Sequence, residues 1–444
     1  MYHEVLFFLM CRHCFQTWLA DTCQSQGWSH GKSPVIWREL IDRGGKGVLI
    51  GGANEFQEYA KGYYGIESPL LSEDMRKISK ENKQCKIEVD KEWTEYKAQS
   101  DPVHVCISNA SSGVCYNLLE GLCRGEVLGQ GIEMIIHLLD SPEKAEYLDG
   151  LRMEIEDLAY GMMRGVVIEK DPQVAFKNCK HIILLDNVEQ GEKSKDAWIK
   201  ENHDLFVKYA KVIDSVADKS VKVLIAGDGP RNFNAYMMIK NAPSIPRQNI
   251  VALSRIVENR AKGVIAERLK VNTSGVVDLT IWGNPHGSHY IDLSRSRVHG
   301  YDGAIIGPDS FSLSSIEMLY DKKWMTTEFL ELVQTKKTRT EEALNHPASL
   351  CQSNAINSLI SHWCNGSPSG QFYSLGLSSE GWYGVPQDLV FSFPVTFHPK
   401  GYWTVVQDID LSEETKTGIA EAIKVTFYTL CFHLLTHQHN WLKE

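Results

Sequence analysis

The sequence predicts an α/β fold with a doubly wound parallel sheet, and three observations lead to this fold class. Short apolar segments typical of buried strands alternate with longer segments in which apolar residues recur at helical spacing. Small and polar residues that favour turns separate these segments. The chain has 444 residues, 43% of them hydrophobic, which is enough for two or three domains with cores of their own.

The composition excludes several classes of protein. The net charge is −10, which disfavours a general binder of nucleic acid, because such proteins carry clustered Lys and Arg. The 11 cysteines form no disulfide-like framework, so we expect free thiols in a reducing compartment. The apolar run Val5 to Met10 is too short to span a membrane and has no cleavage-like site behind it. We therefore expect a cytoplasmic protein that binds neither nucleic acid nor membrane.

The first cysteines form a C-x-x-C pattern from Cys11 to Cys14. Such a pair supports redox chemistry when a strand leads into a turn and a thiolate stands at a helix start. No complete βαβ unit precedes the pair, and neighbouring cysteines also arise by chance in a cysteine-rich segment. A zinc site would need more ligands, and no second pair follows at zinc spacing, so we expect no metal.

Residues 33–64 read as a strand after Pro34, a Gly-rich hairpin, a second strand and a helix opened by Gly51 and Gly52. This order resembles the second half of a glutaredoxin. The first half is not recognisable, so we interpret residues 1–70 as a partial glutaredoxin-like piece without thiol chemistry. Residues 71–100 are rich in charged residues and serine, and we expect a solvated helix and linker there.

The stretch from Val103 to Asp140 reads as an apolar strand, a turn of small residues, a helix and a second apolar strand that ends in an acid. This is the order of a nucleotide-binding βαβ unit, in which the helix N-terminus faces a pyrophosphate and the acid binds a ribose hydroxyl. Asp140 stands at about the right distance from the turn for that role. An acid after a strand is also a common exposed strand end, so both interpretations stay open.

Further strands and helices follow in alternation. Ser141 to Gly161 has the spacing of an amphipathic helix, and His181 to Asp186 and Val221 to Gly227 read as buried strands. Between these strands lies a polar loop, Asn187 to Asp196, which leads into a helix containing Trp198 to Tyr209. This alternation favours a parallel sheet.

Four segments in consistent order resemble the cytosolic-type malate dehydrogenases, and most closely the divergent branch called malate dehydrogenase 1B, which also carries a glutaredoxin-like front piece. The resemblance implies a Rossmann domain at 101–258, a mixed α/β substrate domain at 259–412, a helical tail at 413–444 and, by analogy, a homodimer. The segments are Leu138 to Ala159, Asn241 to Lys262, Ile281 to Asn284 and Tyr383 to Val395.

The family transfers a hydride between NAD and malate or oxaloacetate. The resemblance implies that Asn109, Ser112, Gly113 and Asp140 bind NAD. The family's turn, Gly-x-x-Gly-x-x-Ala, here begins with Asn109 and has Ser112 in the middle. Asn can adopt a positive φ, so Asn109 is expected to keep the tight turn, whereas a side chain at Ser112 crowds the approach to the pyrophosphate.

The resemblance also locates the catalytic positions. The family's Asp-x-x-Arg appears here as Val257 to Arg260, so Arg260 matches the Arg that binds the substrate carboxylate. The catalytic His is replaced by Pro285. Glu258 and His286 stand one residue later and form the hypothesis of a displaced acid/base dyad. Against it, one step along a helix turns a side chain by about 100° and Pro285 stiffens the loop ahead of His286. We therefore favour the interpretation of His286 as a partly exposed loop histidine.

Two other substrate positions differ from the family. Its Asn-Pro is replaced here by Asp228 with an inserted residue, and an acid would repel a carboxylate at short range. Its two loop arginines are absent. Lys193 or Lys195 could meet a carboxylate, but an ammonium lacks the two-pronged geometry of Arg, so we favour a solvated charged loop.

These features lead to two main hypotheses. The first is an NAD-dependent oxidoreductase of the malate dehydrogenase type, acting on malate, oxaloacetate or another 2-hydroxy acid, with a degraded catalytic site. The second is a catalytically inactive protein in which the fold serves binding or scaffolding. Thiol-redox chemistry from the front piece is a third, less favoured reading.

Overall fold

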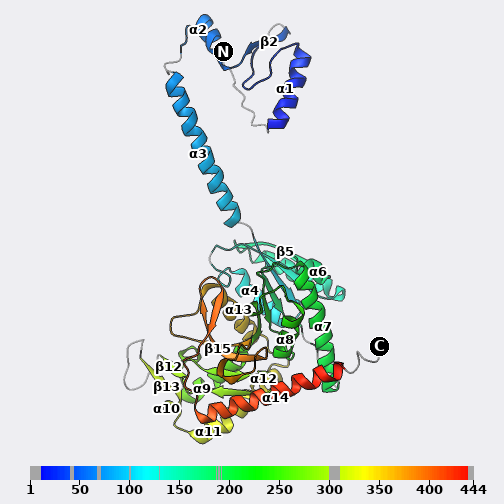
Figure 1. Ribbon diagram of the computed structural model, residues 1–444, viewed down its shortest axis with the longest axis vertical. Helices are drawn as coiled ribbons and strands as arrows, with labels where there is room; N and C mark the ends of the chain where they lie inside the picture. The colour runs from blue at the N-terminus through cyan, green and yellow to red at the C-terminus, as the bar shows by residue number, and fades with distance from the viewer. Residues whose placement is uncertain are drawn as a thin grey trace. The chain divides into compact units, whose positions relative to one another are not determined.

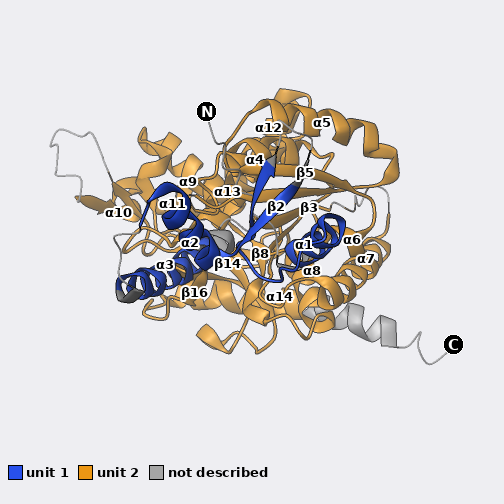
Figure 2. Ribbon diagram, turned by 90° about the horizontal axis from the view of Figure 1, so that it is seen from above, with its two compact units in different colours: residues 1–97 blue, residues 98–444 orange. Residues whose placement is uncertain are grey.

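The chain divides into two compact units, Met1–Lys97 and Ala98–Glu444, in a computed structural model (Figure 2). Each unit is described by itself. No helix within the described part of the chain is long and apolar enough to cross a membrane. The structure describes residues 12–40, 45–67, 72–99, 102–129, 131–186, 188, 191, 193–299 and 311–438.

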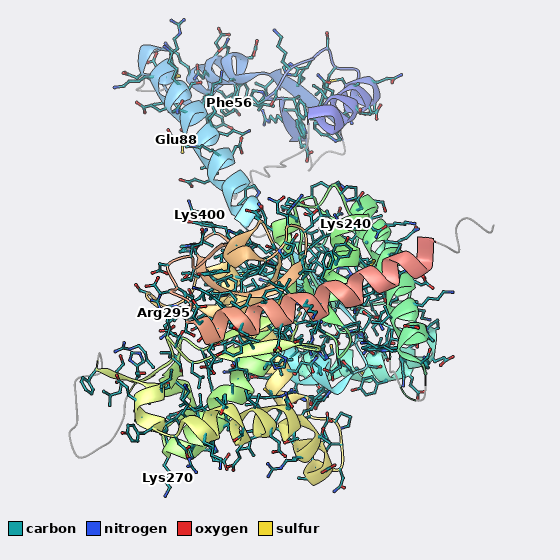
Figure 3. All side chains as sticks on the ribbon, turned by 60° about the horizontal axis from the view of Figure 1, so that its bottom comes forward. Phe56, Glu88, Lys240, Lys270, Arg295 and Lys400 are labelled. Atoms are coloured by element: carbon teal, nitrogen blue, oxygen red, sulfur yellow. The ribbon has the colours of Figure 1, made fainter. Side chains whose placement is uncertain are left out.

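The described residues of the first unit form a small antiparallel hairpin and three helices. The predicted hairpin and the helix after Gly51 are confirmed, and the backbone N–H of Gly52 donates to Glu55 Oε2 at 2.8 Å at the start of that helix. The labelled side chain of Glu88 projects from the longest helix, α3 (Figure 3). Cys11 and the side chain of Cys14 lie outside the described residues. The elements are α1 (Arg12–Gln26), β1 (Ile36–Leu40), β2 (Gly45–Gly51), α2 (Ala53–Tyr64) and α3 (Ser72–Gln99).

The second unit is built on an 11-stranded sheet (Figure 1). Six neighbouring strands, in the order β5-β4-β3-β6-β7-β8, are parallel, which confirms the predicted doubly wound sheet. They are β3 (Val103–Ser108), β4 (Met134–Leu139), β5 (Met163–Glu169), β6 (His181–Leu184), β7 (Lys222–Ile225) and β8 (Ile250–Leu253).

Helices cover both faces of this parallel part (Figure 1). In β3, Val105 and Ile107 face one core and Cys106 faces the other, because successive side chains of a strand alternate. The helices of the first face are α4 (Gly113–Cys123), α5 (Ala145–Asp157) and α13 (Leu350–Asn365). Those of the second are α6 (Pro172–Ala175), α7 (Lys195–Val216) and α8 (Arg231–Asn241).

The sheet continues beyond β8 with antiparallel strands. This confirms the mixed α/β second half of the fold that the family resemblance implied. Strand β14 pairs with β8, and the order continues through β15 and β10 to β11, with β16 beside β15. These strands are β10 (Thr280–Gly283), β11 (His289–Asp292), β14 (Tyr373–Ser378), β15 (Val390–His398) and β16 (Tyr402–Val405).

A small sheet and several helices complete the second unit. The expected C-terminal helix, α14 (Glu413–Gln438), packs on β10 and β11 and buries Ile419 and Ala422. The other elements are β9 (Val276–Val277), β12 (Arg297–His299), β13 (Ser312–Ser314), α9 (Arg255–Leu269), α10 (Ser315–Leu319), α11 (Lys322–Thr326) and α12 (Glu328–Leu344). Short 3₁₀ helices lie at Pro142–Lys144, Arg247–Asn249, Thr273–Gly275 and Trp382–Gly384.

Candidate active site

The carboxyl ends of the parallel strands bring most of the predicted site residues to one edge of the sheet. Asn109 follows β3, Asp140 follows β4 and Asp228 follows β7. Strand β3 lies between β4 and β6, at the point where the order of the strands reverses. Ligands of open α/β sheets bind in the crevice at such a point.

The turn after β3 keeps a tight geometry although it lacks the family's glycines. Asn109 has a φ of 49°, as predicted, and its Nδ2 donates to the carbonyl oxygen of Leu185 at 3.0 Å. Ser112 is the N-cap of α4, and its hydroxyl accepts the backbone N–H of Cys115 at 3.3 Å. The Ser112 hydroxyl is thus turned back onto the first turn of the helix.

The Asp140 carboxylate is fixed beside this turn. One oxygen accepts the backbone N–H of Ser111 at 2.8 Å, and the other accepts the backbone N–H of Ser141 at 2.7 Å. Each carboxylate oxygen has further lone pairs for a ligand. The ribose-binding role of Asp140 stays a prediction, and the geometry is compatible with it.

The described residues fit a dinucleotide. The first amides of a helix have no partner within that helix, and here they belong to α4, whose first residue, Gly113, is exposed. A side chain added at Gly113 would meet nothing closer than the hydroxyl of Ser349, at 3.6 Å from its Cβ. The helix N-terminus therefore has room for a phosphate, with Asp140 at the neighbouring strand end.

A half-buried carboxylate that the sequence analysis missed, Asp186, lies at the end of β6 beside this turn. The hydroxyl of Ser108 donates to Asp186, and the hydroxyl of Tyr209 donates to the other Asp186 oxygen at 3.0 Å. Burial raises the pKa of Asp186, and the two hydroxyl hydrogen bonds oppose that rise. Close by, a Cβ on Gly227 would lie 2.0 Å from the carbonyl oxygen of Asp186, so only glycine fits.

Asp228 is neutralised by two cations from different helices. Arg231 Nη2 lies 3.1 Å from one carboxylate oxygen, and Lys337 Nζ, from α12, lies 2.7 Å from the other. Burial alone would raise the pKa of Asp228, but Arg231 and Lys337 outweigh it and lower the pKa. The expected repulsion of a carboxylate by Asp228 is thus compensated by these two ion pairs.

Arg231 is a second residue that the sequence analysis missed. It is buried, and it donates from Nε to the carbonyl oxygen of Gly227 at 2.7 Å and from Nη1 to that of Leu253 at 3.3 Å. Burial lowers the pKa of Arg231 to about 10, whereas the negative charge of Asp228 acts to raise it. Arg231 therefore joins the ends of β7 and β8. Its signal in the sequence was a charged residue directly after Gly229 and Pro230.

Arg260 has no counter-ion in the part of the chain that the structure describes. The residue is half-buried on α9, and its guanidinium has no hydrogen bond or ion pair with any residue that the structure describes. Its charge contributes to lowering the pKa values of Arg231 and His286, so the three side chains lie within electrostatic range of one another. A guanidinium whose charge is not compensated by a described residue is suited to bind a carboxylate.

His286 lies in the loop after β10. Its backbone N–H donates to Asn284 Oδ1 at 3.2 Å, and the carbonyl oxygen of the preceding Gly283 accepts Asn232 Nδ2 at 3.2 Å. Desolvation and then the charge of Arg231 lower the pKa of His286 well below its usual value, while Asp228 acts in the opposite direction. The residue is exposed to solvent, and its imidazole is neutral at neutral pH.

The prediction that Glu258 is the acid partner of His286 is wrong. Glu258 is fully buried: one carboxylate oxygen lies 2.6 Å from Lys262 Nζ, and the other accepts the backbone N–H of Ser374 at 2.8 Å. Both oxygens are thus engaged inside the core. The acid whose charge reaches His286 is Asp228. Val257, at the family's Asp position, is buried in an apolar cluster.

The loop before α7 is only partly described, because Asn187, Glu189, Gln190 and Glu192 lie outside the described residues. Lys193 is exposed and pairs with Glu201 at 2.6 Å, and Lys195 is the exposed first residue of α7. These two residues agree with the favoured reading of a solvated charged loop.

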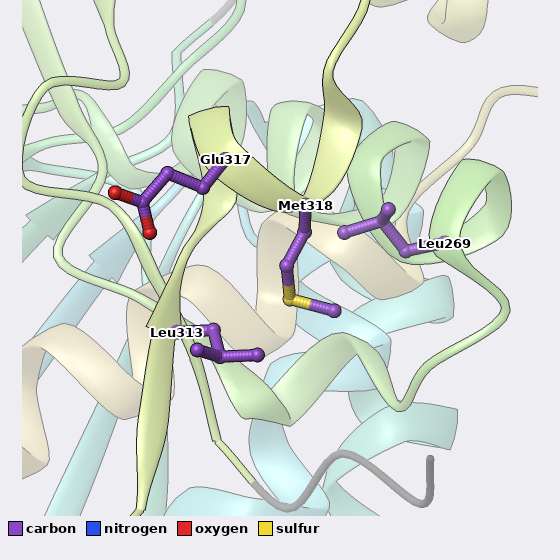
Figure 4. Close-up of a pocket in the computed structure, with 4 residues that line it drawn as sticks. All are labelled: Leu269, Leu313, Glu317 and Met318. Carbon is purple, nitrogen blue, oxygen red and sulfur yellow. The ribbon is translucent and has the colours of Figure 1, made fainter. Parts of the chain in front are cut away.

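A pocket of about 300 Å³ opens in the other half of the second unit (Figure 4). It is lined by Leu269, Leu313, Glu317 and Met318, from the end of α9, β13 and α10. None of the predicted site residues is among these four. We therefore assign the candidate active site from the strand ends and not from this pocket.

Comparison with known proteins agrees with this geometry. Residues 103–251 match the family described as lactate/malate dehydrogenase, NAD binding domain, and residues 255–426 match its alpha/beta C-terminal domain. Residues 4–98 match the family described as "Putative malate dehydrogenase 1B N-terminal domain".

The chain is 46% identical over 407 residues to "Putative malate dehydrogenase 1B" of Branchiostoma floridae, covering 91% of this chain and 78% of that protein. It is 33% identical over 315 residues to "Malate dehydrogenase, cytoplasmic" of Zea mays, covering 70% of this chain and 92% of that protein.

Solved structures resemble the second unit. Malate dehydrogenase from Naegleria fowleri has a TM-score of 0.67 at 26% identity and covers 74% of this chain and 96% of its own. Trichomonas vaginalis lactate dehydrogenase in complex with NADH and oxamate has a TM-score of 0.67 at 26% identity and covers 75% of this chain and 99% of its own.

Proposed function

This chain belongs to the malate dehydrogenase family, within the malate dehydrogenase 1B group, and from that premise we propose that it is an NAD-dependent oxidoreductase acting on a 2-hydroxy or 2-oxo acid of the malate and oxaloacetate class. The observation that carries the proposal is the half-buried Arg260, which has no counter-ion among the described residues. The cationic Arg231 and the neutral His286 lie within its electrostatic range.

The cofactor part of the proposal rests on the βαβ unit around β3. When bound, NAD would accept or supply the hydride of the reaction. The N-terminus of α4 would hold its pyrophosphate, and Asp140 would accept the ribose hydroxyls. An acid at this position favours NAD over the form with a 2′-phosphate, because the two negative charges would repel each other.

The substrate part rests on charge. Arg260 would bind the carboxylate next to the reacting carbon through two parallel hydrogen bonds. Asp228 is already compensated by Arg231 and Lys337, so the anion meets a region in which positive charge prevails. The missing loop arginines leave the second carboxylate of malate with weaker contacts, and we expect a high KM for dicarboxylates.

The proton part rests on His286. A neutral imidazole can take the proton of a hydroxyl group as the hydride leaves, and it can return that proton in the reverse direction. Asp228 favours the protonated form of His286, so it takes over the electrostatic role of the family's Asp. We place this activity in the cytoplasm, in line with the cytoplasmic relative from Zea mays.

One observation favours a second function, binding without turnover. Val257 brings an apolar side chain to the position of the family's orienting Asp, and Asp228 is already held by Arg231 and Lys337. An imidazole that no acid orients loses most of its catalytic effect. In this alternative the protein binds NAD and a carboxylate but transfers no hydride.

The test uses the purified full chain. We expect NADH fluorescence to report binding, and oxaloacetate to oxidise NADH at a rate that falls about a hundredfold to ten-thousandfold in His286→Ala. The control is His398→Ala, since His398 contacts Thr404 in the β15–β16 hairpin.

Each outcome of this test decides between the two functions. NADH binding without turnover of any 2-oxo acid would establish the binding protein, and absence of NADH binding would overturn both readings. Turnover that is unaffected in His286→Ala would leave an oxidoreductase but remove His286 from its mechanism.

A further inference from the structure

Helix α3 exposes an apolar stripe to solvent. From Asp74 to Trp93 every side chain is exposed except that of Met75, which is half-buried. The exposed side chains include large apolar ones: 42% of Ile78 and 54% of Val89 are accessible. An amphipathic surface helix normally buries such residues against its own domain. Here the apolar side chains from Ile78 to Val89 are exposed to solvent.

The stripe follows a heptad repeat. Met75, Asn82 and Val89 occupy successive a positions, and Ile78 and Cys85 occupy the d positions between them. The next d position is Glu92, and the same register in the sequence reaches Leu71 before the stripe and Tyr96 after it. Apolar residues at a and d are the contacts by which two helices pack in a left-handed coiled coil, and here they cover about two heptads, from Met75 to Val89.

Asn82 is the polar residue at an a position between Met75 and Val89, and Glu92 at the next d position ends the apolar part of the repeat. A lone Asn at an a position is characteristic of two-stranded parallel coiled coils, in which it fixes the register and the number of strands at some expense of stability. Asn82 lies between Ile78 and Cys85 and divides the stripe into two segments. The stripe therefore has both the apolar contacts and the register marker of a helix pair.

The flanking charges favour one orientation. The g positions Asp74, Glu81 and Glu88 are acidic. The e positions are Ser79, Lys86 and Trp93, of which only Lys86 is charged. In a parallel pair, position g faces position e of the following heptad on the partner, so Glu81 would meet Lys86. In an antiparallel pair the acidic g positions would face one another and repel. Glu88, which projects from α3 in Figure 3, belongs to this acidic row.

We propose that α3 forms a parallel two-stranded coiled coil with α3 of a second copy of this chain, in register about Asn82. The occupant is a second copy because Glu81 of each strand then faces Lys86 of the other, which gives two ion pairs across the helix pair. The proposal concerns the first unit and is independent of the proposed oxidoreductase activity.

Cys85 gives a direct test. It is exposed and unoxidised, and as a d residue it would face Cys85 of the second copy across the seam. Treatment of the full chain with copper phenanthroline and oxygen would remove two protons and two electrons from the two thiols and join them as a disulfide. We expect most of the protein to become a covalent dimer, with the Cys85–Cys85 peptide identified by mass spectrometry.

Matched variants separate this contact from random collisions. Cys85→Ser should lose the covalent dimer. Cys85→Ser combined with Lys80→Cys moves the thiol to an f position on the outer side of the helix and should cross-link at least tenfold more slowly. Equal rates for Cys85 and the relocated cysteine would overturn the proposal, as would the absence of cross-linking at Cys85.

A second pair of variants breaks the seam without breaking the helix. Ile78→Glu with Val89→Glu retains good helix formers and puts like charges in the seam, so cross-linking at Cys85 should cease. The helical signal in circular dichroism and the NADH titration serve as controls for folding. Persistent Cys85 cross-linking in this variant would also overturn the proposal. Dimers made through the second unit alone would not respond to these changes.

Discussion

Lys337 Nζ lies 2.7 Å from a carboxylate oxygen of Asp228, although the two residues are 109 positions apart in the chain. The other oxygen of Asp228 faces Arg231 at 3.1 Å. One negative charge therefore stands between two positive ones, and Arg260 adds a third that is not compensated within the described residues. The net positive charge at this strand edge is the property that favours an anionic substrate.

Asp228→Asn should strengthen the binding of a carboxylate. Removal of the negative charge beside Arg231 and Lys337 is worth about 1 kcal/mol in a partly solvated site, which is about fivefold in affinity. Calorimetric titration with oxaloacetate in the presence of NADH measures this change. Lys337→Gln removes a positive charge from the same pair and should weaken binding by a similar factor. Two variants that move the affinity in the same direction would show that the anion does not bind near this pair.

Asp140→Asn should weaken NADH binding more than NADPH binding. The amide can still accept one backbone N–H, from Ser111 or Ser141, but it lacks the charge that favours ribose hydroxyls and repels a 2′-phosphate. The loss of one charge-assisted hydrogen bond is worth about 1.5–3 kcal/mol. Fluorescence titrations with both nucleotides check the prediction. An unchanged ratio of the two dissociation constants would remove Asp140 from the ribose site.

The parts of the site that were predictable from the sequence are local. The strand, turn, helix and strand around Asn109 follow from apolar periodicity and turn residues, and the positive φ of Asn109 follows from its side-chain chemistry. Arg231 and Lys337 were not predictable in the same way. Their partners are backbone carbonyls and a carboxylate brought together by tertiary packing, for which a single sequence carries no periodic signal.

His137 should make the protein less stable in mild acid. It is buried in β4 with its Nε2 2.8 Å from Nδ1 of His104, and burial together with the charge of His104 lowers its pKa to about 4. The unfolded chain takes up a proton near pH 6.5, whereas the folded chain resists until about pH 4. The contribution of His137 to the free energy of unfolding is therefore fully present above pH 6.5, and it is lost as the pH drops from 6.5 to 4.

The size of this loss follows from the pKa difference. One pKa unit corresponds to about 1.4 kcal/mol, so up to about 3 kcal/mol is at stake. Urea unfolding at pH 7.5, 5.5 and 4.5 measures it, and His137→Gln should flatten the dependence over this range. A variant with the same pH dependence as the natural chain would assign the acid sensitivity to other groups, such as His362, whose pKa burial lowers to about 3.

The wrong prediction for Glu258 shows that alignment with a family motif neglects the pairing of side chains within a helix. Glu258 stands one position from the family's Asp, but it also stands four positions before Lys262, at the spacing that brings two helix side chains together. That pairing, with Ser374 from β14, draws the carboxylate into the core. The i, i+4 signal was present in the sequence and competed with the motif.

Glu258→Gln should lower stability and leave the proton chemistry unchanged. The amide keeps a hydrogen bond from the backbone N–H of Ser374, but Lys262 becomes an uncompensated buried cation, which costs about 3–5 kcal/mol. Adding Lys262→Met removes that cation and should restore part of the loss. The urea midpoint measures stability, and the pH profile of NADH oxidation measures proton transfer. If folded Glu258→Gln loses turnover with KM intact, while Glu258→Gln with Lys262→Met is equally inactive, the carboxylate acts in catalysis and its assignment to the core is wrong.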